Sequence, residues 1–424
     1  MEQDDESPVD RIIEAVRRPR TNRTERRYRR IPPAITPIRA GDILAGVRDH
    51  RSGVGRDEFR NRIASFLDAE DTATYTSYRR ALCACLLELA AHADDGRTDV
   101  HFPAFCSSDF ADAIEGAGLT PVRYDVDPET LALDDDSLRS LSAENALAVV
   151  AVNVVGYGSP MHRLEEYCRK TDTYLVEALG YALGSEYNGE RLGTFGDCSV
   201  INFQQGKPIP VGGGMVVSRT EAFEFTDAGR PAVSPNVGML AGYGAFGHPR
   251  MYYLYSRATD WLTRLRGESA RYSTHPESKF DVPYRPPFAT MSNFQGAVAT
   301  RVFDRLETHR RRRERTASAY ATRLADCPHV RHLRPVEGLS KHQYVRYPLV
   351  VDSPELRDEL VTALSRVGVE TAALYDWPPI DETVFPGAAQ LQDGIITLPT
   401  HPYVDETDRK LICRTIRDVV SAPT

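Results

Sequence analysis

Apolar and polar residues alternate along the first half of the chain with two periods, one typical of helices and one of strands. The run at residues 146–155 is almost entirely apolar and β-branched, which predicts a strand buried on both faces. Alternating helices and buried strands predict an α/β fold, with a mostly parallel sheet covered on both sides by helices. The predicted helices are residues 77–91, 109–117 and 160–170, and the predicted strands are residues 100–104, 120–124, 146–155, 173–177, 198–203 and 215–218.

Residues 219–290 break this alternation, because they are rich in glycine, proline, tyrosine and arginine. Within them, residues 250–265 carry apolar side chains at helical spacing and predict one amphipathic helix. Such a helix could serve as a lid, as a contact with a second subunit or as a membrane-surface element. We favour packing on the parent domain or a subunit contact.

The rest of the chain predicts a long helix over residues 293–324 and then a small α+β unit. The unit is predicted to contain strands at residues 344–351, 369–374 and 394–398 and helices at residues 354–367 and 405–420. We therefore expect three parts. They are a polar N-terminal arm that is at least partly disordered (1–34), a large α/β domain that includes the insertion (35–305) and a small C-terminal α+β domain (306–424).

Composition and charge exclude several classes of protein. With 424 residues, 41% of them hydrophobic, the chain can bury a large core, and its formal net charge of -8 gives no overall attraction to nucleic acid. The seven cysteines are scattered without a Cys-x-x-Cys pair, which argues against a disulfide framework or a zinc site and favours a reducing cytoplasm. The longest apolar runs, residues 81–91 and 146–156, are too short for a membrane span.

The segment from residue 193 to residue 214 carries the main candidate chemistry. A β-rich run at 198–203 leads into a turn that presents Lys207, and three glycines follow at 212–214. Glycine lets backbone approach a ligand closely, and a lysine held there suits a Schiff base to an aldehyde cofactor. A lysine on an exposed surface loop is the alternative, since most lysines are exposed.

A series of short motifs follows a fixed order along most of the chain. The motifs are 124–128 (Tyr-Asp-Val-Asp-Pro), Leu133 with Asp134, Gly156 with Met161, 175–177 (Leu-Val-Glu), 182–184 (Ala-Leu-Gly), 193–197 (Gly-Thr-Phe-Gly-Asp), Phe203, Lys207, Met291, Ser292, Gln295, Ala297 and 398–402 (Leu-Pro-Thr-His-Pro). In this order and spacing, over roughly residues 35–424, the chain resembles the DegT/DnrJ/EryC1/StrS family of sugar aminotransferases. The resemblance implies the fold type I scaffold, the cofactor pyridoxal 5'-phosphate (PLP), a homodimer, and two small-molecule substrates, an amino donor such as glutamate and a nucleotide-linked keto-sugar.

The resemblance gives Lys207 the role of the Schiff-base lysine. It places the family's phosphate cradle on Ser77, Tyr78 and Arg79 at the start of a helix, where backbone N–H groups and the helix dipole suit an anion. Tyr78 stands where the family has glycine, and Arg79 could add a charge-assisted contact to the phosphate. Asn202 replaces a phosphate-binding serine and can still donate a hydrogen bond.

The resemblance also implies an aspartate that pairs with the ring nitrogen of the cofactor, and Ala178 stands at that position. Glu177 can substitute only where the strand end twists, because neighbouring side chains on a strand point to opposite faces. The family's polar residue near the hydroxyl group of the cofactor ring falls on Tyr181.

Two further positions complete the implied site. The aromatic residue that stacks on the cofactor ring is expected at Phe105 or Phe102, because Ser107 occupies its usual place. The family's asparagine from a partner subunit falls near Phe288.

Two functions follow from these residues. The first is a PLP-dependent aminotransferase acting on a nucleotide-linked keto-sugar in glycan or secondary-metabolite biosynthesis, with Lys207 as the proton-transfer base. The second is a catalytically degenerate member of the family, with a binding, scaffold or regulatory role. The alanine at position 178 and the altered phosphate cradle motivate the second function, and removing one partner of a buried charge pair costs about 3–5 kcal/mol.

Overall fold

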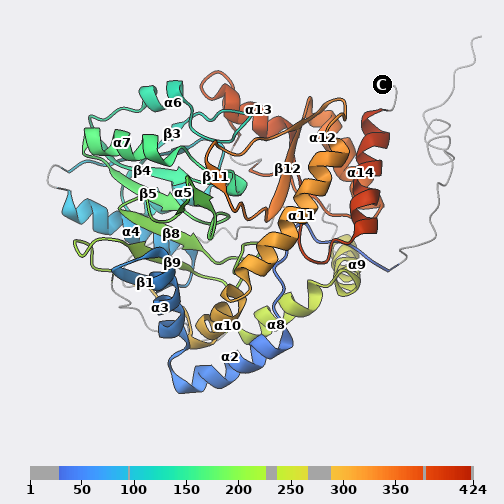
Figure 1. The fold of residues 1–424 in the computed structure, drawn as a ribbon, viewed down its shortest axis with the longest axis horizontal. Coiled ribbons are helices and arrows are strands. Elements are labelled where there is room, and N and C mark those ends of the chain that lie inside the picture. The colour runs from blue at the N-terminus through green and yellow to red at the C-terminus, as the bar shows by residue number, and fades with distance from the viewer. Residues whose placement is uncertain (1–27, 94–95, 226–235, 266–287, 376–378, 422–424) are drawn as a thin grey trace, which may run out of the picture.

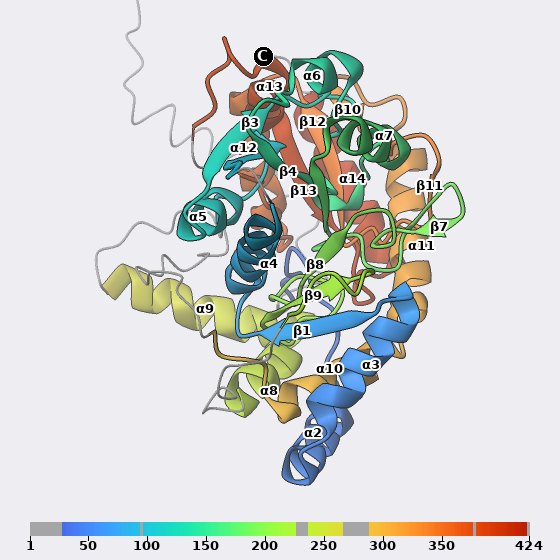
Figure 2. The same ribbon diagram turned by 90° about the vertical axis from the view of Figure 1, so that its left-hand side faces the viewer.

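The computed structural model describes residues 28–93, 96–225, 236–265, 288–375 and 379–421. Its centre is a seven-stranded sheet with the order β1-β9-β8-β5-β4-β2-β3, and helices cover both faces (Figure 1, Figure 2). Within the described part of this sheet only β9 runs antiparallel, so the predicted α/β fold with a mostly parallel sheet is confirmed. The strands are β1 (Asp71–Tyr75), β2 (Asp99–Pro103), β3 (Thr120–Tyr124), β4 (Ala146–Val152), β5 (Tyr174–Ala178), β8 (Cys198–Asn202) and β9 (Gly214–Ser218).

Three predicted helices pack on this sheet, α4 and α5 on one face and α7 on the other (Figure 2). α4 begins directly after the end of β1, where the Ser77 side chain caps it by accepting from the N–H of Arg80. α5 and α7 cross over between parallel strands, as such connections require. The helices are α4 (Tyr78–His92), α5 (Asp109–Gly116) and α7 (Met161–Thr171).

Two helices that the hydrophobic pattern does not predict precede the sheet, α2 (Ala40–Ser52) and α3 (Gly55–Leu67). α3 is rich in charge and buries only a narrow stripe of side chains, so its periodicity is weak. Both pack on α10, and the contact depends on small residues: a Cβ added at Gly296 would lie 2.5 Å from the carbonyl oxygen of Gly55.

The single long helix predicted over residues 293–324 is wrong, because the chain breaks it at Asp304 and Arg305. The two pieces are α10 (Asn293–Phe303) and α11 (Leu306–Leu324). Arg305 pairs with Asp42 of α2 at 2.6 Å, and Asp304 pairs with Arg62 of α3. These contacts hold the break against α2 and α3, so α11 runs in a new direction toward the C-terminal elements (Figure 1).

A second, three-stranded sheet has the order β10-β12-β13 and packs with α11, α12 and α14 around its own hydrophobic cluster. The strand predicted at residues 369–374 is wrong. This segment makes only isolated bridges, Ile31 with Val369 and Ala372 with Thr397, because its backbone divides between two different partners. The elements are β10 (Val330–His332), β12 (Arg346–Val351), β13 (Ile395–Pro399), α12 (Pro354–Arg366), α13 (Pro386–Gly394) and α14 (Glu406–Val420).

The N-terminal arm is only partly described, since residues 1–27 lie outside the described residues. The part that follows is packed rather than loose. Ile31 is buried, its N–H donates to the carbonyl of Gly368 at 2.8 Å, and its own carbonyl accepts from the N–H of Glu370 at 2.9 Å. The polar arm therefore ends before Ile31.

In the insertion 219–290, residues 226–235 and 266–287 lie outside the described residues. The amphipathic helix predicted at 250–265 is α9 (Pro249–Leu265), and α8 (Val237–Phe246) precedes it. Met251, Leu254 and Tyr255 of α9 are exposed in the single chain. Their apolar face is therefore not covered by the described part of the parent domain.

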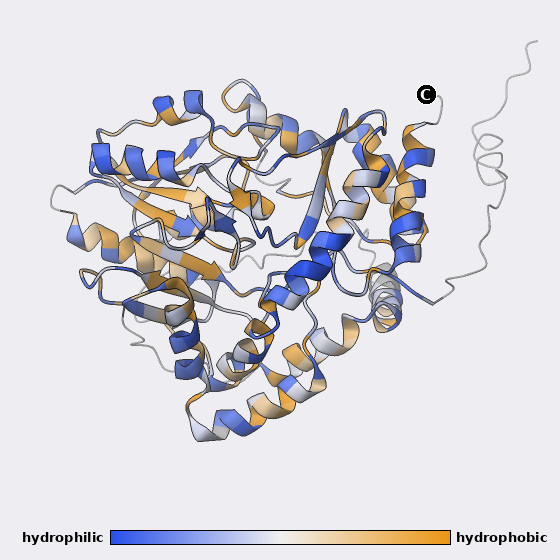
Figure 3. Cartoon of the chain, viewed as in Figure 1, coloured by the Kyte–Doolittle hydropathy of each residue, from blue (hydrophilic) through white to orange (hydrophobic). Residues whose placement is uncertain are grey.

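Hydrophobic residues concentrate on the central strands, and hydrophilic ones mark the outward faces of helices such as α7 and α11 (Figure 3). Among the helices described, none combines the length and the apolar character needed to cross a bilayer. Short elements complete the chain: α6 (Asp135–Ser140), η1 (Val154–Gly156), β6 (Glu186–Tyr187), β7 (Glu190–Arg191) and β11 (Leu339–Ser340).

Candidate functional site

Lys207 follows β8 at the carboxyl end of the sheet, the edge where ligands bind in α/β folds. Gly206 has a φ of 78°, which glycine adopts without strain, and turns the chain directly into Lys207. The Lys207 backbone is fixed on both sides. Its N–H donates to the carbonyl of Gln204 at 3.3 Å, and its carbonyl accepts from the hydroxyl of Thr36 at 2.8 Å.

The amine of Lys207 faces an aromatic ring. Its Nζ lies 3.5 Å from the ring centroid of Tyr181, a cation–π contact. It also lies beside Gly180, where an added Cβ would be 3.7 Å from Nζ. The lysine is half-buried, so the structure brings Lys207 and Tyr181 together and does not leave the lysine on an open surface loop.

Asn202, the last residue of β8, is bound to the turn that follows it. Its Oδ1 accepts from the N–H of Gln204 at 2.8 Å, and its Nδ2 donates to Gln204 Oε1 at 3.3 Å. An added Cβ at Gly180 would lie 3.5 Å from the Asn202 Cβ, so Asn202 lies close to Lys207. Its amide group shapes the turn that carries the lysine.

The glycines after Lys207 allow close packing of the chain on itself. A Cβ added at Gly213 would lie 2.6 Å from the carbonyl oxygen of Tyr75, and one added at Gly214 would lie 2.9 Å from the Cα of Tyr78. These glycines therefore bring β9 against β1 and the start of α4. This contact accounts for them without a ligand.

The carboxylate of Glu177 is fully buried and accepts three backbone N–H groups. Gly193 donates to Oε2 at 2.7 Å, and Phe195 and Gly196 donate to Oε1 at 2.7 and 2.9 Å. Burial raises the pKa of Glu177 to about 7, while the three N–H groups act in the opposite direction. Both carboxylate oxygens are engaged by this turn, so the structure contradicts a cofactor contact for Glu177. Strand alternation already favours a Glu177 side chain that points away from the face of Ala178.

Ala178 ends β5, pairs with Val200 of β8 and is buried in the main hydrophobic cluster. A methyl group therefore stands where the resemblance implies a carboxylate. Together with the orientation of Glu177, this leaves the implied ring-nitrogen position without its acid from either residue.

The predicted phosphate cradle is occupied by contacts within the chain. Ser77 uses its hydroxyl to cap α4. Arg79 is buried, forms an ion pair with Asp109 through Nε and lies 3.4 Å from a carboxylate oxygen of Asp112 through Nη1. Two carboxylates at the start of α5 thus neutralise the one cation assigned to phosphate, and they would repel a phosphate group.

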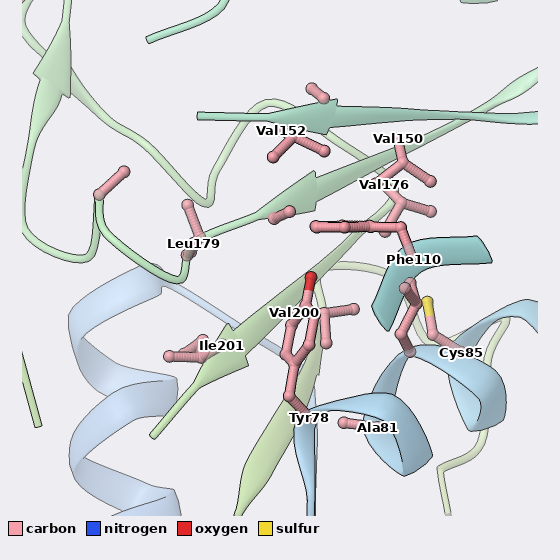
Figure 4. Packing of buried hydrophobic residues seen from close by; sticks show 14 of the residues in the cluster. Tyr78, Ala81, Cys85, Phe110, Val150, Val152, Val176, Leu179, Val200 and Ile201 are labelled. Carbon is pink, nitrogen blue, oxygen red and sulfur yellow. The ribbon is translucent and has the colours of Figure 1, made fainter. Parts of the chain in front are cut away.

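The side chain of Tyr78 points into the protein. It runs from the start of α4 into the space between α4, α5 and the strands, with its hydroxyl end toward the strands (Figure 4). Its ring packs edge-on against Phe110, with the ring centroids 5.7 Å apart. Its hydroxyl is buried and makes no hydrogen bond among the described residues, and burial raises the pKa of Tyr78.

The expected ring-stacking residue is also enclosed. Phe105 is fully buried, and its ring contacts Tyr375 with the centroids 5.2 Å apart. Ser107 accepts the N–H of Asp109 and so helps to start α5. Phe288 packs edge-on against Tyr75 at 6.1 Å.

The sequence carries no local signal of the part that α5 takes in this region. Asp109 and Arg79 are 30 residues apart, and no local spacing signals their pairing. Phe110 reads as an ordinary core residue of a helix. Only the packing of α4 on α5 brings Asp109, Asp112 and Phe110 to the cradle.

A separate cavity of about 440 Å³ lies between α6, α7 and the segment after β10. None of the residues assigned to the site lines it. Its lining residues are Asp127, Thr130, Ala132, Leu133, Asp134, Asp135, Asp136, Pro160, Arg163, Val336 and Glu337.

Comparison with known proteins identifies the family. The DegT/DnrJ/EryC1/StrS aminotransferase family model matches residues 44–226 and 287–417, and the chain belongs to this family. GDP-perosamine synthase of Vibrio cholerae is 24% identical over 85% of this chain and 90% of its own length. A pleiotropic regulatory protein of Geobacillus stearothermophilus is 21% identical over 73% of this chain and 74% of its own length.

The solved structures agree on the fold. The PLP form of the putative sugar aminotransferase Spr1654 from Streptococcus pneumoniae matches with a TM-score of 0.71 and 19% identity, over 92% of this chain and 98% of that chain. At this identity the likeness shows the fold alone. The fold type I scaffold implied by the motifs is therefore confirmed.

PLP is the cofactor that this family implies, and the residues of this chain fit it at one point only. Lys207 suits the Schiff base. Ala178 offers nothing to the ring nitrogen, Arg79 is neutralised by carboxylates, and Tyr78 projects a ring into the interior beside the cradle. On this set of side chains the site does not fit PLP.

Proposed function

We propose that this chain is a catalytically degenerate member of its family that binds a nucleotide-linked sugar and has a binding or regulatory role in glycan or secondary-metabolite biosynthesis. The observation that carries the proposal is the pair Glu177 and Ala178. The carboxylate of Glu177 is held by the turn at 193–196, and Ala178 has none.

The missing acid matters because a carboxylate at the ring nitrogen keeps that nitrogen protonated, and only then does the bound cofactor draw electrons strongly. Removing one partner of such a buried pair costs about 3–5 kcal/mol. If all of this is lost from the transition state, the rate falls by about two to four powers of ten. Turnover at a useful rate is therefore not expected.

The ligand class is supported by the relatives and by the position of Lys207. One relative is named as a GDP-perosamine synthase, and a structural neighbour as a putative sugar aminotransferase. Lys207 places a cation at the carboxyl edge of the sheet, where it can donate to phosphate or sugar oxygens. A relative named as a pleiotropic regulatory protein supports a role other than turnover.

A second candidate is PLP-dependent amino transfer from a donor such as glutamate to a nucleotide-linked keto-sugar. Lys207 supports it, because the residue follows β8 at the carboxyl edge of the sheet and its amine lies 3.5 Å from the ring centroid of Tyr181. In this candidate Lys207 also moves the proton.

The proposal includes a homodimer in the cytoplasm. Two exposed apolar groups support the dimer: Leu44 and Val47 on α2, and Met251, Leu254 and Tyr255 on α9. The cytoplasmic location is supported by the seven cysteines, which are all buried thiols.

The test measures the affinity of the full chain for GDP-, dTDP- and UDP-linked sugars by calorimetry, without added PLP. We expect Lys207→Met to weaken binding by about tenfold or more, because a charge-assisted hydrogen bond is lost. Lys341→Met is the matched control, since Lys341 pairs with Glu186 on the surface. Equal effects of the two substitutions, or no binding by the unaltered chain, would contradict the proposal.

The second candidate is tested with PLP, glutamate and keto-sugar nucleotides. We expect no amino-sugar product by mass spectrometry. Product formation that Lys207→Met abolishes would establish the second candidate instead.

A further inference from the structure

We propose that the side chain of Tyr78 takes the place of the cofactor ring, so that this chain excludes PLP from its own site. The inference rests on the proposed loss of amino transfer and gives a structural cause for it. It is carried by the backbone position of Tyr78, the packing of its ring and the charges beside it.

The backbone of Tyr78 lies against Gly214 at the start of β9, the strand that follows Lys207. A Cβ added at Gly214 would lie 2.9 Å from the Tyr78 Cα, so the start of α4 touches β9. Gly214 in turn pairs with Asn202, the residue that shapes the turn of Lys207. The start of α4 thus lies against the edge of the sheet where the cofactor phosphate and ring are expected.

The ring of Tyr78 fills the interior from this point. It is 3% exposed, packs on Phe110 and extends toward the strands, where Val200 of β8 is labelled (Figure 4). Val200 pairs with Ala178 of β5. A phenol ring and a pyridine ring cannot occupy this space together. Moving Tyr78 out would expose a whole aromatic side chain, which buries about 150–250 Å².

The charged group beside Tyr78 is also not available to a phosphate. Arg79 is taken by Asp109 and Asp112, so a phosphate at the start of α4 would meet two carboxylates before it met a free cation. The hydroxyl of Tyr78 has no hydrogen-bond partner among the described residues. Because this buried hydroxyl makes no hydrogen bond within the described part of the chain, the contribution of the Tyr78 side chain here is the volume that its aromatic ring fills.

The experiment measures PLP uptake by the full chain. Unaltered protein, Ala178→Asp, Tyr78→Gly with Ala178→Asp, and Tyr78→Phe are each incubated with PLP, and bound cofactor is measured by ultrafiltration and visible absorbance. Borohydride reduction followed by peptide mass spectrometry then shows whether PLP is attached to Lys207. We expect no retained PLP and no Lys207 adduct for the unaltered chain and for Tyr78→Phe, which keeps the ring.

The double variant is expected to retain more PLP on Lys207 than either the unaltered chain or Ala178→Asp alone, and adding Lys207→Ala is expected to abolish this uptake. A Lys207 adduct in the unaltered chain overturns the inference, and this measurement needs no variant to fold. A folded double variant that retains no more PLP than Ala178→Asp also overturns the assignment to Tyr78. Nucleotide-sugar binding is measured without PLP, so failure of the proposed function is seen separately.

Discussion

Arg79 at the start of α4 and Asp109 at the start of α5 form a buried ion pair across 30 residues of sequence. The pair fastens the two helices on one face of the central sheet, at the edge that carries Lys207. Arg79, to which the family resemblance gives a phosphate contact, therefore has a structural role in this chain.

Asp109→Asn is expected to lower the free energy of unfolding by about 3–5 kcal/mol, because it leaves the Arg79 guanidinium buried with a weakened partner. Urea unfolding followed by circular dichroism measures this loss. Asp135→Asn is the control, since Asp135 pairs with Arg163 on the surface and its loss is expected to cost less than about 1 kcal/mol. Similar losses in both variants would show that the Arg79 pair is not effectively buried.

Tyr78→Phe is expected to leave the free energy of unfolding unchanged or to raise it by up to about 2 kcal/mol, because the removed hydroxyl has no partner among the described residues. Tyr320→Phe is the matched case. Its hydroxyl is also buried but donates to the carbonyl of Pro399 at 2.9 Å, so its removal is expected to cost about 1–2 kcal/mol. A loss at Tyr78 as large as that at Tyr320 would mean that the Tyr78 hydroxyl is bonded in solution.

Glu177 is expected to make the protein less stable as the pH rises from about 4.5 to about 7. Its folded pKa is raised to about 7, above the ordinary value of 4.5, so in this window the folded state holds a proton that the unfolded state has released. The change amounts to about 3 kcal/mol and levels off above pH 7. Melting temperatures of the unaltered chain and Glu177→Gln across this range test it, and parallel pH profiles for the two proteins would contradict it.

Leu254→Glu is expected to turn a dimer into a monomer, because it places a charge on the exposed apolar face of α9. Light scattering after gel filtration measures the mass. Val384→Glu is the control, since Val384 is 58% exposed and Leu254 is 56% exposed, but Val384 lies away from α9. Monomers for the unaltered chain, or an equal effect of both substitutions, would refute the proposed dimer.

The sequence predicts the strands of the central sheet and the position of Lys207 because both depend on local patterns. β4 is apolar on both faces, and Lys207 follows a short β-rich run. The break at Asp304 and Arg305 could not be predicted in this way, because the side chains that hold it come from α2 and α3. Helical periodicity alone continues through the break.

The candidate site shows the same division. The substitution at Ala178 is visible in the sequence, and strand alternation already favours the observed direction of Glu177. The direction of the Tyr78 ring and the capture of Arg79 are not visible, because both depend on how α5 packs on α4.

The short segment from Ile31 to Thr36 forms hydrogen bonds with distant parts of the chain on both of its sides. It bonds to Gly368 and Glu370, its Pro32 carbonyl meets His401 at 2.9 Å, and Thr36 bonds to the carbonyl of Lys207. Trimming the chain up to residue 27 leaves this segment whole. Trimming as far as residue 40 would remove all of these hydrogen bonds together, so a single short segment links the turn of Lys207 to residues of the C-terminal domain more than 150 positions away.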